Sequence, residues 1–139
     1  MTSDRRLFLL LNIGQRRVMR WLDQRTDAGA QASAVQAGAL FHVARHDGAL
    51  IGEVAAALHL APSAMTGLAD RMAKAGLLER RSDADDGRAT RLYMTAAGHD
   101  ALKKARGLLR ELNARMCEGF SDDEIDTVAR WLAALQQRF

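Results

Sequence analysis

The residues best suited to bind a charged partner lie between positions 62 and 94 of this 139-residue chain. Six basic side chains fall in this stretch, namely Arg71, Lys74, Arg80, Arg81, Arg88 and Arg91. Guanidinium and ammonium groups gathered in this way suit polyanions, above all the phosphates of nucleic acids. The formal net charge of the chain is only +3, so the distribution of the basic residues carries this indication, and the total charge does not.

The first part of this stretch, residues 62–75, has two different faces at helical spacing. The apolar face carries Met65, Leu68, Ala69 and Met72, and the small or polar face carries Ser63, Thr66, Gly67, Asp70, Arg71 and Lys74. A face without bulky apolar groups fits a DNA major groove, which is about 12 Å wide. Arg71 and the N–H groups of the first turn suit phosphates, because Ala61 offers no side-chain acceptor to cap them.

The second part predicts a β-hairpin with strands at about residues 77–82 and 89–94. Its polar tip is Asp83-Ala84-Asp85-Asp86-Gly87-Arg88, and the Asp-Gly step predicts a tight turn with positive φ. Arg88 is placed to enter a minor groove, and we expect Asp86 to orient it or to brace the loop.

Acidic residues at the same tip would repel DNA phosphates unless they are paired. We therefore expect at least Asp86 to be engaged, while Asp83 and Asp85 face solvent. The sequence leaves two roles for Arg80, Arg81 and Arg91: each contacts a phosphate, or each is a solvated charge on a strand.

Other reactive side chains are few. His42 and His46 lie one helical turn apart, but the sequence shows no third ligand for a metal. Cys117 is the only cysteine, so no intrachain disulfide or Cys-rich metal site can form, and an inert helical cysteine is favoured over a redox switch. No nucleophile–base pair or phosphate-binding glycine loop stands out. The sequence therefore predicts a protein that is not an enzyme and needs no cofactor.

The elements that position these residues follow from periodicity and capping signals. Helices are predicted at about 5–25, 32–45, 51–58, 62–75, 95–118 and from Ser121 onward, with Asp47-Gly48 and Gly76 as stops, Thr95 as an N-cap and Ser121-Asp122-Asp123-Glu124 as a capping box. The order is α-α-α-α-β-β-α-α, a mainly α fold with a small β-hairpin. No apolar run approaches the ~18 residues of a membrane span and no signal peptide pattern is present, so we expect a cytoplasmic protein with no membrane partner.

A short helix, a break, a second helix and a basic hairpin together indicate a winged helix-turn-helix. We expect a single domain, 1–139, with a winged helix-turn-helix lobe at about 32–94 and a helical dimerisation lobe at about 4–27 and 95–138. The terminal helices carry more apolar surface than this small core can cover, so a second copy should cover it. The expected dimer interface consists of Leu7, Leu10, Leu11, Leu109, Leu112, Met116, Ile125, Val128 and Leu132.

Four motifs carry a family resemblance: Glu53-Val54-Ala55, Met65-Thr66-Gly67-Leu68-Ala69-Asp70-Arg71-Met72, Gly76-Leu77-Leu78-Glu79-Arg80, and Asp86-Gly87-Arg88 followed by Leu92-Tyr93-Met94-Thr95-Ala96-Ala97-Gly98. As a set they resemble the MarR family of multiple-antibiotic-resistance-type regulators. The Asp-x-Arg wing is the most specific of them. The chain departs from the family at Gly67, where many relatives carry a longer side chain, and at Ala61, which replaces a polar cap.

The resemblance implies a homodimer built from the first and last two helices, which binds palindromic double-stranded DNA operators near promoters. It also implies a small, often aromatic effector that weakens DNA binding, in a cleft that we place near His42, Arg45, His46 and Trp21. We therefore expect a sequence-specific transcriptional repressor. The alternative is a winged-helix scaffold for protein interaction or dimerisation that does not bind DNA, suggested by the mild charge, the acidic tip and Gly67.

Overall fold

The computed structural model describes residues 6–26 and 29–139. Three residues of the predicted lobe segment 4–27 lie outside the described residues, namely Asp4, Arg5 and Asp27. Arg5 is also the start of the predicted first helix. The chain divides into two compact units, Met1–Leu102 and Lys103–Phe139.

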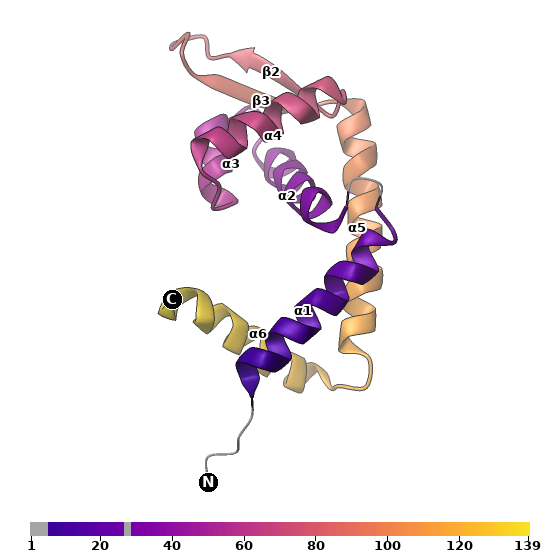
Figure 1. The fold of residues 1–139 in the computed structure, drawn as a ribbon. Helices are drawn as coiled ribbons and strands as arrows, with labels where there is room; N and C mark the ends of the chain where they lie inside the picture. The colour runs from indigo at the N-terminus through magenta and orange to yellow at the C-terminus, as the bar shows by residue number, and fades with distance from the viewer. Residues whose placement is uncertain (1–5, 27–28) are drawn as a thin grey trace. The chain divides into compact units, whose positions relative to one another are not determined.

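The described elements are mainly helices, with one small sheet (Figure 1). They are α1 (Leu7–Asp23), α2 (Ala30–Arg45), β1 (Ala49–Leu50), α3 (Ile51–Ala57), α4 (Pro62–Lys74), β2 (Leu78–Ser82), β3 (Thr90–Met94), α5 (Ala96–Cys117) and α6 (Asp122–Arg138). The predicted mainly α fold with a hairpin is confirmed. None of the helices within the described residues is both long and apolar enough to cross a membrane.

The sheet has three antiparallel strands in the order β1-β3-β2. The hairpin pairs Leu78 with Met94 and Ser82 with Thr90 at its two ends. The two-residue strand β1 was not predicted, and it joins the sheet by pairing Ala49 with Leu92. The wing is thus anchored to the segment that follows α2.

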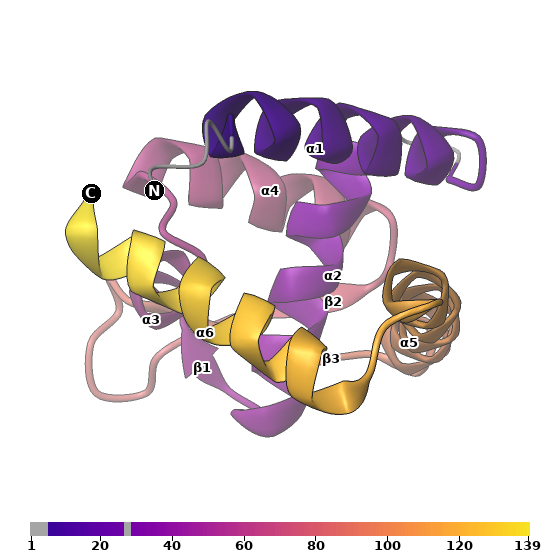
Figure 2. The same cartoon turned by 90° about the horizontal axis from the view of Figure 1, so that it is seen from below.

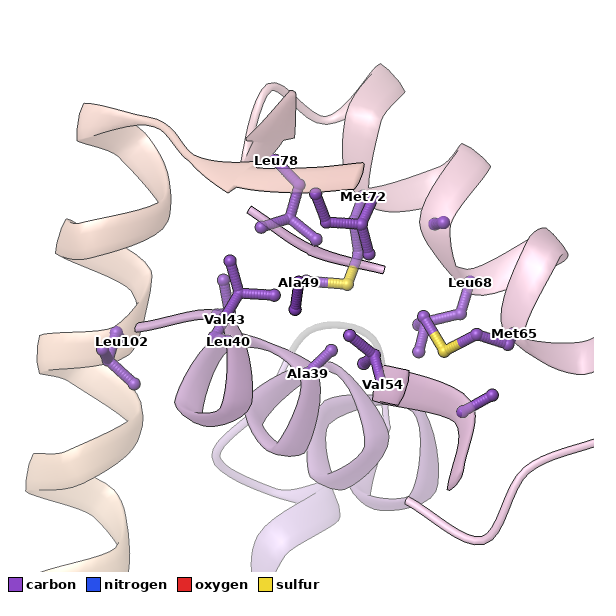
Figure 3. Close-up of a cluster of buried hydrophobic side chains, with 13 residues drawn as sticks. Ala39, Leu40, Val43, Ala49, Val54, Met65, Leu68, Met72, Leu78 and Leu102 are labelled. Carbon is purple, nitrogen blue, oxygen red and sulfur yellow. The ribbon is translucent and has the colours of Figure 1, made fainter. Parts of the chain in front are cut away.

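The core of the first unit lies between α2, α3, α4 and the sheet (Figure 3). Burying a large apolar side chain contributes about 1.5–3 kcal/mol. The predicted inner face of α4 is buried as expected. The largest fully buried side chains are Leu40, Met65, Met72, Leu92, Val43 and Val54.

The start of α5 is held against the junction between α4 and β2. Thr95 caps the helix as predicted, because its Oγ1 accepts a hydrogen bond of 3.0 Å from the Gly98 N–H. The same Oγ1 lies 2.6 Å from the Gly76 carbonyl oxygen and 3.0 Å from that of Leu77. A Cβ built on Gly98 would lie only 2.1 Å from the Leu77 carbonyl oxygen. Only glycine allows this approach without displacing the backbone.

The second unit contains most of α5 and the whole of α6. The predicted capping box is confirmed, because Ser121 Oγ accepts from the Glu124 N–H at 3.2 Å and Glu124 Oε2 accepts from the Ser121 N–H at 2.9 Å. Figure 2 views α5 nearly along its axis while α6 lies lengthwise across the picture, so the two helices run in clearly different directions. No residue of α6 is buried.

Candidate nucleic-acid interface

The turn between α3 and α4 sets the geometry of the helix-turn-helix. Glu53 Oε2 accepts a hydrogen bond of 3.1 Å from the Leu50 N–H and so caps the start of α3. His59 has a left-handed φ of 54°, and the Leu60 N–H bonds the Ala55 carbonyl oxygen at 2.9 Å. This left-handed residue with its long-range bond is the Schellman arrangement, which ends α3 sharply before Pro62 begins α4.

The outer face of α4 is open to solvent, as the sequence predicts. Ser63, Thr66, Asp70, Arg71 and Lys74 are exposed, and Gly67 is partly covered. The Thr66 hydroxyl donates to the Pro62 carbonyl oxygen at 3.0 Å, so its oxygen remains available as an acceptor. Ala61 has an extended backbone and provides no side-chain cap. The N–H groups of the first turn of α4 therefore have no side-chain acceptor from the N-cap residue.

Asp70 forms an ion pair with Arg80, which links the recognition face of α4 to strand β2. Both side chains are at least one third exposed. The carboxylate is therefore engaged within the protein, and so is the guanidinium. This arrangement places two of the predicted DNA-contacting residues against each other.

Arg81 is held by its own strand. It forms two hydrogen bonds with the Glu79 carboxylate, from Nε to Oε1 and from Nη2 to Oε2, each at 3.1 Å. Its guanidinium also lies 4.3 Å from the centre of the Tyr93 ring. The hydrogen bond from Arg81 lowers the pKa of the Glu79 carboxyl below its usual value. Residues two apart on a strand share a face, so this pair could have been found from the sequence.

Arg91 braces the hairpin against the turn before β1. Its Nε bonds Asp83 Oδ1 at 2.9 Å, and its Nη1 donates to the Gly48 carbonyl oxygen at 2.7 Å. The hydrogen bond from Arg91 lowers the pKa of the Asp83 carboxyl. The expectation that Asp83 faces solvent is wrong, because its side chain is only 17% exposed in this pair. The hydrogen bond between Arg91 and Gly48 joins residues that are 43 positions apart in the sequence. No local sequence pattern could predict it.

The tip of the hairpin is closed by Asp86. Its Oδ1 accepts the Arg88 N–H at 3.0 Å, and its carbonyl oxygen accepts the Ala89 N–H at 3.0 Å. The predicted bracing of the loop by Asp86 is confirmed. The predicted positive φ at Gly87 is wrong, since Gly87 is not among the described glycines with positive φ. The Asp86 carboxylate makes the turn by bonding a backbone N–H two residues later, so no left-handed residue is needed.

The six basic residues of this stretch therefore fall into two groups. Arg80, Arg81 and Arg91 are each paired with a carboxylate. Within residues 6–26 and 29–139, no ion pair involves Arg71, Lys74 or Arg88. The unpaired group lies on the outer face of α4 and at the tip of the wing, the two places that the sequence predicts to meet DNA.

The predicted effector residues are only partly brought together. The His42 and His46 rings lie 4.8 Å apart, centre to centre, and Arg45 between them in sequence is exposed. Trp21 is instead covered by the Arg25 guanidinium, 3.8 Å from its ring centre, and its buried indole nitrogen has no hydrogen-bond partner. In the described part of the chain, no three His, Cys, Asp or Glu side chains gather as a metal site requires.

The predicted interface residues are mostly exposed in the single chain. Leu112 is buried and Ile125 is partly buried, while the other seven, Leu7, Leu10, Leu11, Leu109, Met116, Val128 and Leu132, are exposed. Phe8, which the sequence analysis did not name, is also exposed, at 82%. The run of apolar residues from Leu7 to Leu11 signals it, because five consecutive positions cover every side of a helix.

Part of this chain matches known proteins in sequence. A family profile described as the MarR family matches residues 31–89. The uncharacterized HTH-type transcriptional regulator YsmB of Bacillus subtilis is 35% identical over 86 residues. The winged helix-turn-helix region of the chain thus matches the MarR family. The match covers 62% of this chain and 59% of YsmB, so the chain spans about three fifths of that relative.

Solved structures show that the MarR-like fold extends over nearly the whole chain. The PcaV regulator of Streptomyces coelicolor, in complex with its natural ligand, covers 99% of this chain and 98% of its own, with a TM-score of 0.78 and 17% identity. A cysteine-to-serine mutant of MarR from E. coli, complexed with operator DNA, covers 93% and 92%, with a TM-score of 0.77 and 20% identity. The profile and YsmB matches agree with the resemblance to the MarR family of winged helix-turn-helix regulators, and the solved structures show the shared fold.

Proposed function

We propose that this chain is a MarR-family regulator, which binds an operator in double-stranded DNA as a homodimer and represses nearby genes. The observation that carries the proposal is the grouping of the basic residues. The three without an internal ion pair, Arg71, Lys74 and Arg88, lie where DNA must pass a winged helix-turn-helix. The shared fold with MarR in its operator complex supports the same use of the fold.

In this proposal α4 enters the major groove. Ser63, Thr66 and Lys74 present hydroxyl and ammonium groups to base edges, and Gly67 and Asp70 lie on the same face. The first-turn N–H groups of α4, which Ala61 does not cap, bind a phosphate together with the helix dipole. The Asp70–Arg80 ion pair links the helix to the first strand of the wing.

The wing contacts the neighbouring minor groove through Arg88. Asp86 holds the backbone of Arg88 and leaves its exposed guanidinium to reach outward. Arg91 supports the hairpin from inside through Asp83 and the Gly48 carbonyl. A narrow minor groove has a strong negative potential that attracts an inserted arginine.

A second copy of the chain completes the protein in this proposal. The exposed apolar side chains of α1 and those of α6 need a cover that the single chain does not supply to them. A two-fold dimer places its recognition helices one DNA turn apart, about 34 Å, and so selects a palindromic operator. The helical dimerisation lobe is built from residues 4–27 and 95–138, and the winged lobe from residues 32–94.

Regulation by a small molecule is the remaining part of the proposal. PcaV was solved in complex with its natural ligand on the same fold. For this chain we place a small, often aromatic effector near His42, Arg45, His46 and Trp21, with the effect of weakening operator binding. We place such a regulator in the cytoplasm, together with the DNA that it binds.

One observation favours the alternative, a winged-helix scaffold without DNA binding. Residues 62–94 contain six basic side chains but also five acidic ones, Asp70, Glu79, Asp83, Asp85 and Asp86, which gives a net charge of only +1. Weak net charge lowers the affinity for any polyanion. A titration with DNA separates the two functions, because only the regulator binds its promoter.

The test is a fluorescence anisotropy titration of the whole chain on the promoter region beside its own gene, against a scrambled duplex. We expect tighter binding to the promoter, and Arg88→Ala should cost about 1–3 kcal/mol of that affinity. Arg81→Ala is the matched control, because it removes an arginine from the same hairpin that is already paired with Glu79. Equal affinity for both duplexes refutes the proposed function, and equal losses in the two variants refute the role of Arg88.

The dimer has a separate test by light scattering at micromolar concentration. Leu10→Lys places a charge on a side chain that is 61% exposed in the single chain and covered in the proposed dimer, so it should shift the mass to that of a monomer. Gln15→Lys adds the same charge at an exposed polar position of α1 and should leave the dimer intact. A monomeric wild type contradicts the dimer.

A further inference from the structure

Gly67 and Arg71 form an unusual pair on the outer face of α4. A Cβ built on Gly67 would lie 3.3 Å from Arg71 Nη1, so the guanidinium occupies the space beside the glycine. Gly67 is accordingly part-covered, while Ser63, Thr66 and Asp70 on the same face are exposed. The side chain that stands over position 67 is thus the side chain of Arg71.

This placement brings the guanidinium toward the middle of the recognition face. Side chains on a helix lean toward its N-terminus, so residue 71 covers residue 67, one turn earlier. Taking the four buried residues of α4 as the inner face, position 67 lies about 30° from the middle of the outer face and position 71 about 70° from it, at 100° per residue. The backbone of Arg71 stands at the edge of the face, whereas its charged group lies close to the centre.

The other groups on the face are less suited to specify a base. The Asp70 carboxylate is paired with Arg80, and the Thr66 hydroxyl already donates within the helix. Lys74 lies at the last residue of α4 and carries a point charge, while the N-terminal part of a recognition helix supplies most base contacts. The guanidinium of Arg71 has five donors in a rigid fork and no carboxylate partner in the described residues.

We propose that Arg71 reads a guanine in the major groove through the gap left by Gly67. The fork matches O6 and N7 of guanine, which is the most frequent specific contact between an arginine and DNA. This inference rests on the proposed function and sharpens it, because Arg71 was expected to bind phosphate. Gly67 then determines specificity by its lack of a side chain, and a longer residue there displaces the guanidinium.

The experiment is a selection of bound duplexes from a random pool, followed by sequencing, with the whole chain as the bait. The wild type should enrich half-sites with one strongly preferred guanine. Arg71→Lys keeps the charge but lacks the fork, and Gly67→Leu fills the gap without adding a hydrogen-bonding group. Both variants should weaken the preference for that guanine by about 5- to 150-fold, the equivalent of one bidentate contact.

Gly107→Leu is the matched control, since it makes the same change at a helical glycine of α5 where an added Cβ would meet nothing within 4 Å. It should leave the selected sequence unchanged. A wild type that enriches no sequence refutes the proposed function itself. A clear motif whose guanine preference survives Arg71→Lys, or a motif without a preferred guanine, overturns the role of Arg71 while the function stands. Because Arg71 is exposed, Arg71→Lys remains informative even if Gly67→Leu fails to fold.

Discussion

Replacing Gly98 by alanine should destabilise the chain, although alanine is the better helix former. In an exposed helix the change from glycine to alanine gains about 1 kcal/mol. Here the new Cβ would lie 2.1 Å from the Leu77 carbonyl oxygen and 3.2 Å from its carbon. The contact would have to open by about 1.3 Å to reach 3.4 Å, the lower end of ordinary van der Waals contact. The new Cβ is fixed to the backbone of α5 and the oxygen belongs to the backbone of Leu77, so no flexible side chain can give way.

The size of the loss follows from the contacts that the opening disturbs. Overpacking typically costs about 1–3 kcal/mol, and a rigid backbone neighbour puts this case at the upper end. Separating α5 from residues 76 and 77 also stretches the hydrogen bond that the single Thr95 hydroxyl hydrogen shares between their two carbonyl oxygens, worth about 0.5–1.5 kcal/mol. After subtracting the gain in helix propensity, we expect a net loss of about 2–4 kcal/mol in the free energy of unfolding.

The assay is equilibrium unfolding in urea at one fixed protein concentration, since association would otherwise shift the apparent stability. Gly107→Ala is the control, because its Cβ would meet nothing within 4 Å in the same helix. It should raise the free energy of unfolding by about 0.5–1 kcal/mol. Equal effects of the two substitutions, or a stabilised Gly98→Ala, would show that the approach of α5 to Leu77 does not constrain the fold.

Three further predictions concern the turn, the wing and the core. His59→Gly should stabilise the chain by about 0.5–1 kcal/mol in urea unfolding, since glycine adopts the left-handed φ without strain. A lower free energy of unfolding for this variant would show that His59 is not strained. Folding lowers the pKa of Asp83 through Arg91, so this stabilisation is complete above the ordinary aspartate pKa of about 4 and is lost as the pH falls. Asp83→Asn should therefore flatten the decline in stability between pH 5 and 2, and an unchanged decline would count against the pair. Met72→Ala should cost about 2–5 kcal/mol in the same assay, because the side chain is fully buried, and a cost below 1 would mean that the core closes around the gap.

Most of the fold could be predicted from local signals. The apolar positions of α4 repeat at helical spacing, and Pro62, Gly76, Thr95 and the Ser121 capping box mark the ends of helices. Strand β1 could not be predicted in this way. It has two residues, and it exists only because Ala49 meets Leu92 in the folded chain.

The candidate site was predictable in composition but not in its internal pairing. The six basic residues and the polar face of α4 are visible in the sequence, whereas the Asp70–Arg80 and Arg91–Gly48 contacts depend on tertiary structure. The error at Gly87 has a local cause. The Asp-Gly pattern allows two turn geometries, and the Asp86 carboxylate selects the one that needs no positive φ.

The division of the basic residues into paired and unpaired groups has a consequence for the ions around DNA. An unpaired cation that neutralises a phosphate releases a condensed counterion, with a slope of about −0.9 per contact in a plot of log affinity against log salt. Even if Arg71, Lys74 and Arg88 from two copies each released a counterion, the slope would be no steeper than about −5, whereas twelve such residues would give about −11. A shallow slope means weak attachment to random DNA. Little of the protein would then be bound to non-specific sites along the chromosome. Nearly all of the protein would be free to bind the operator.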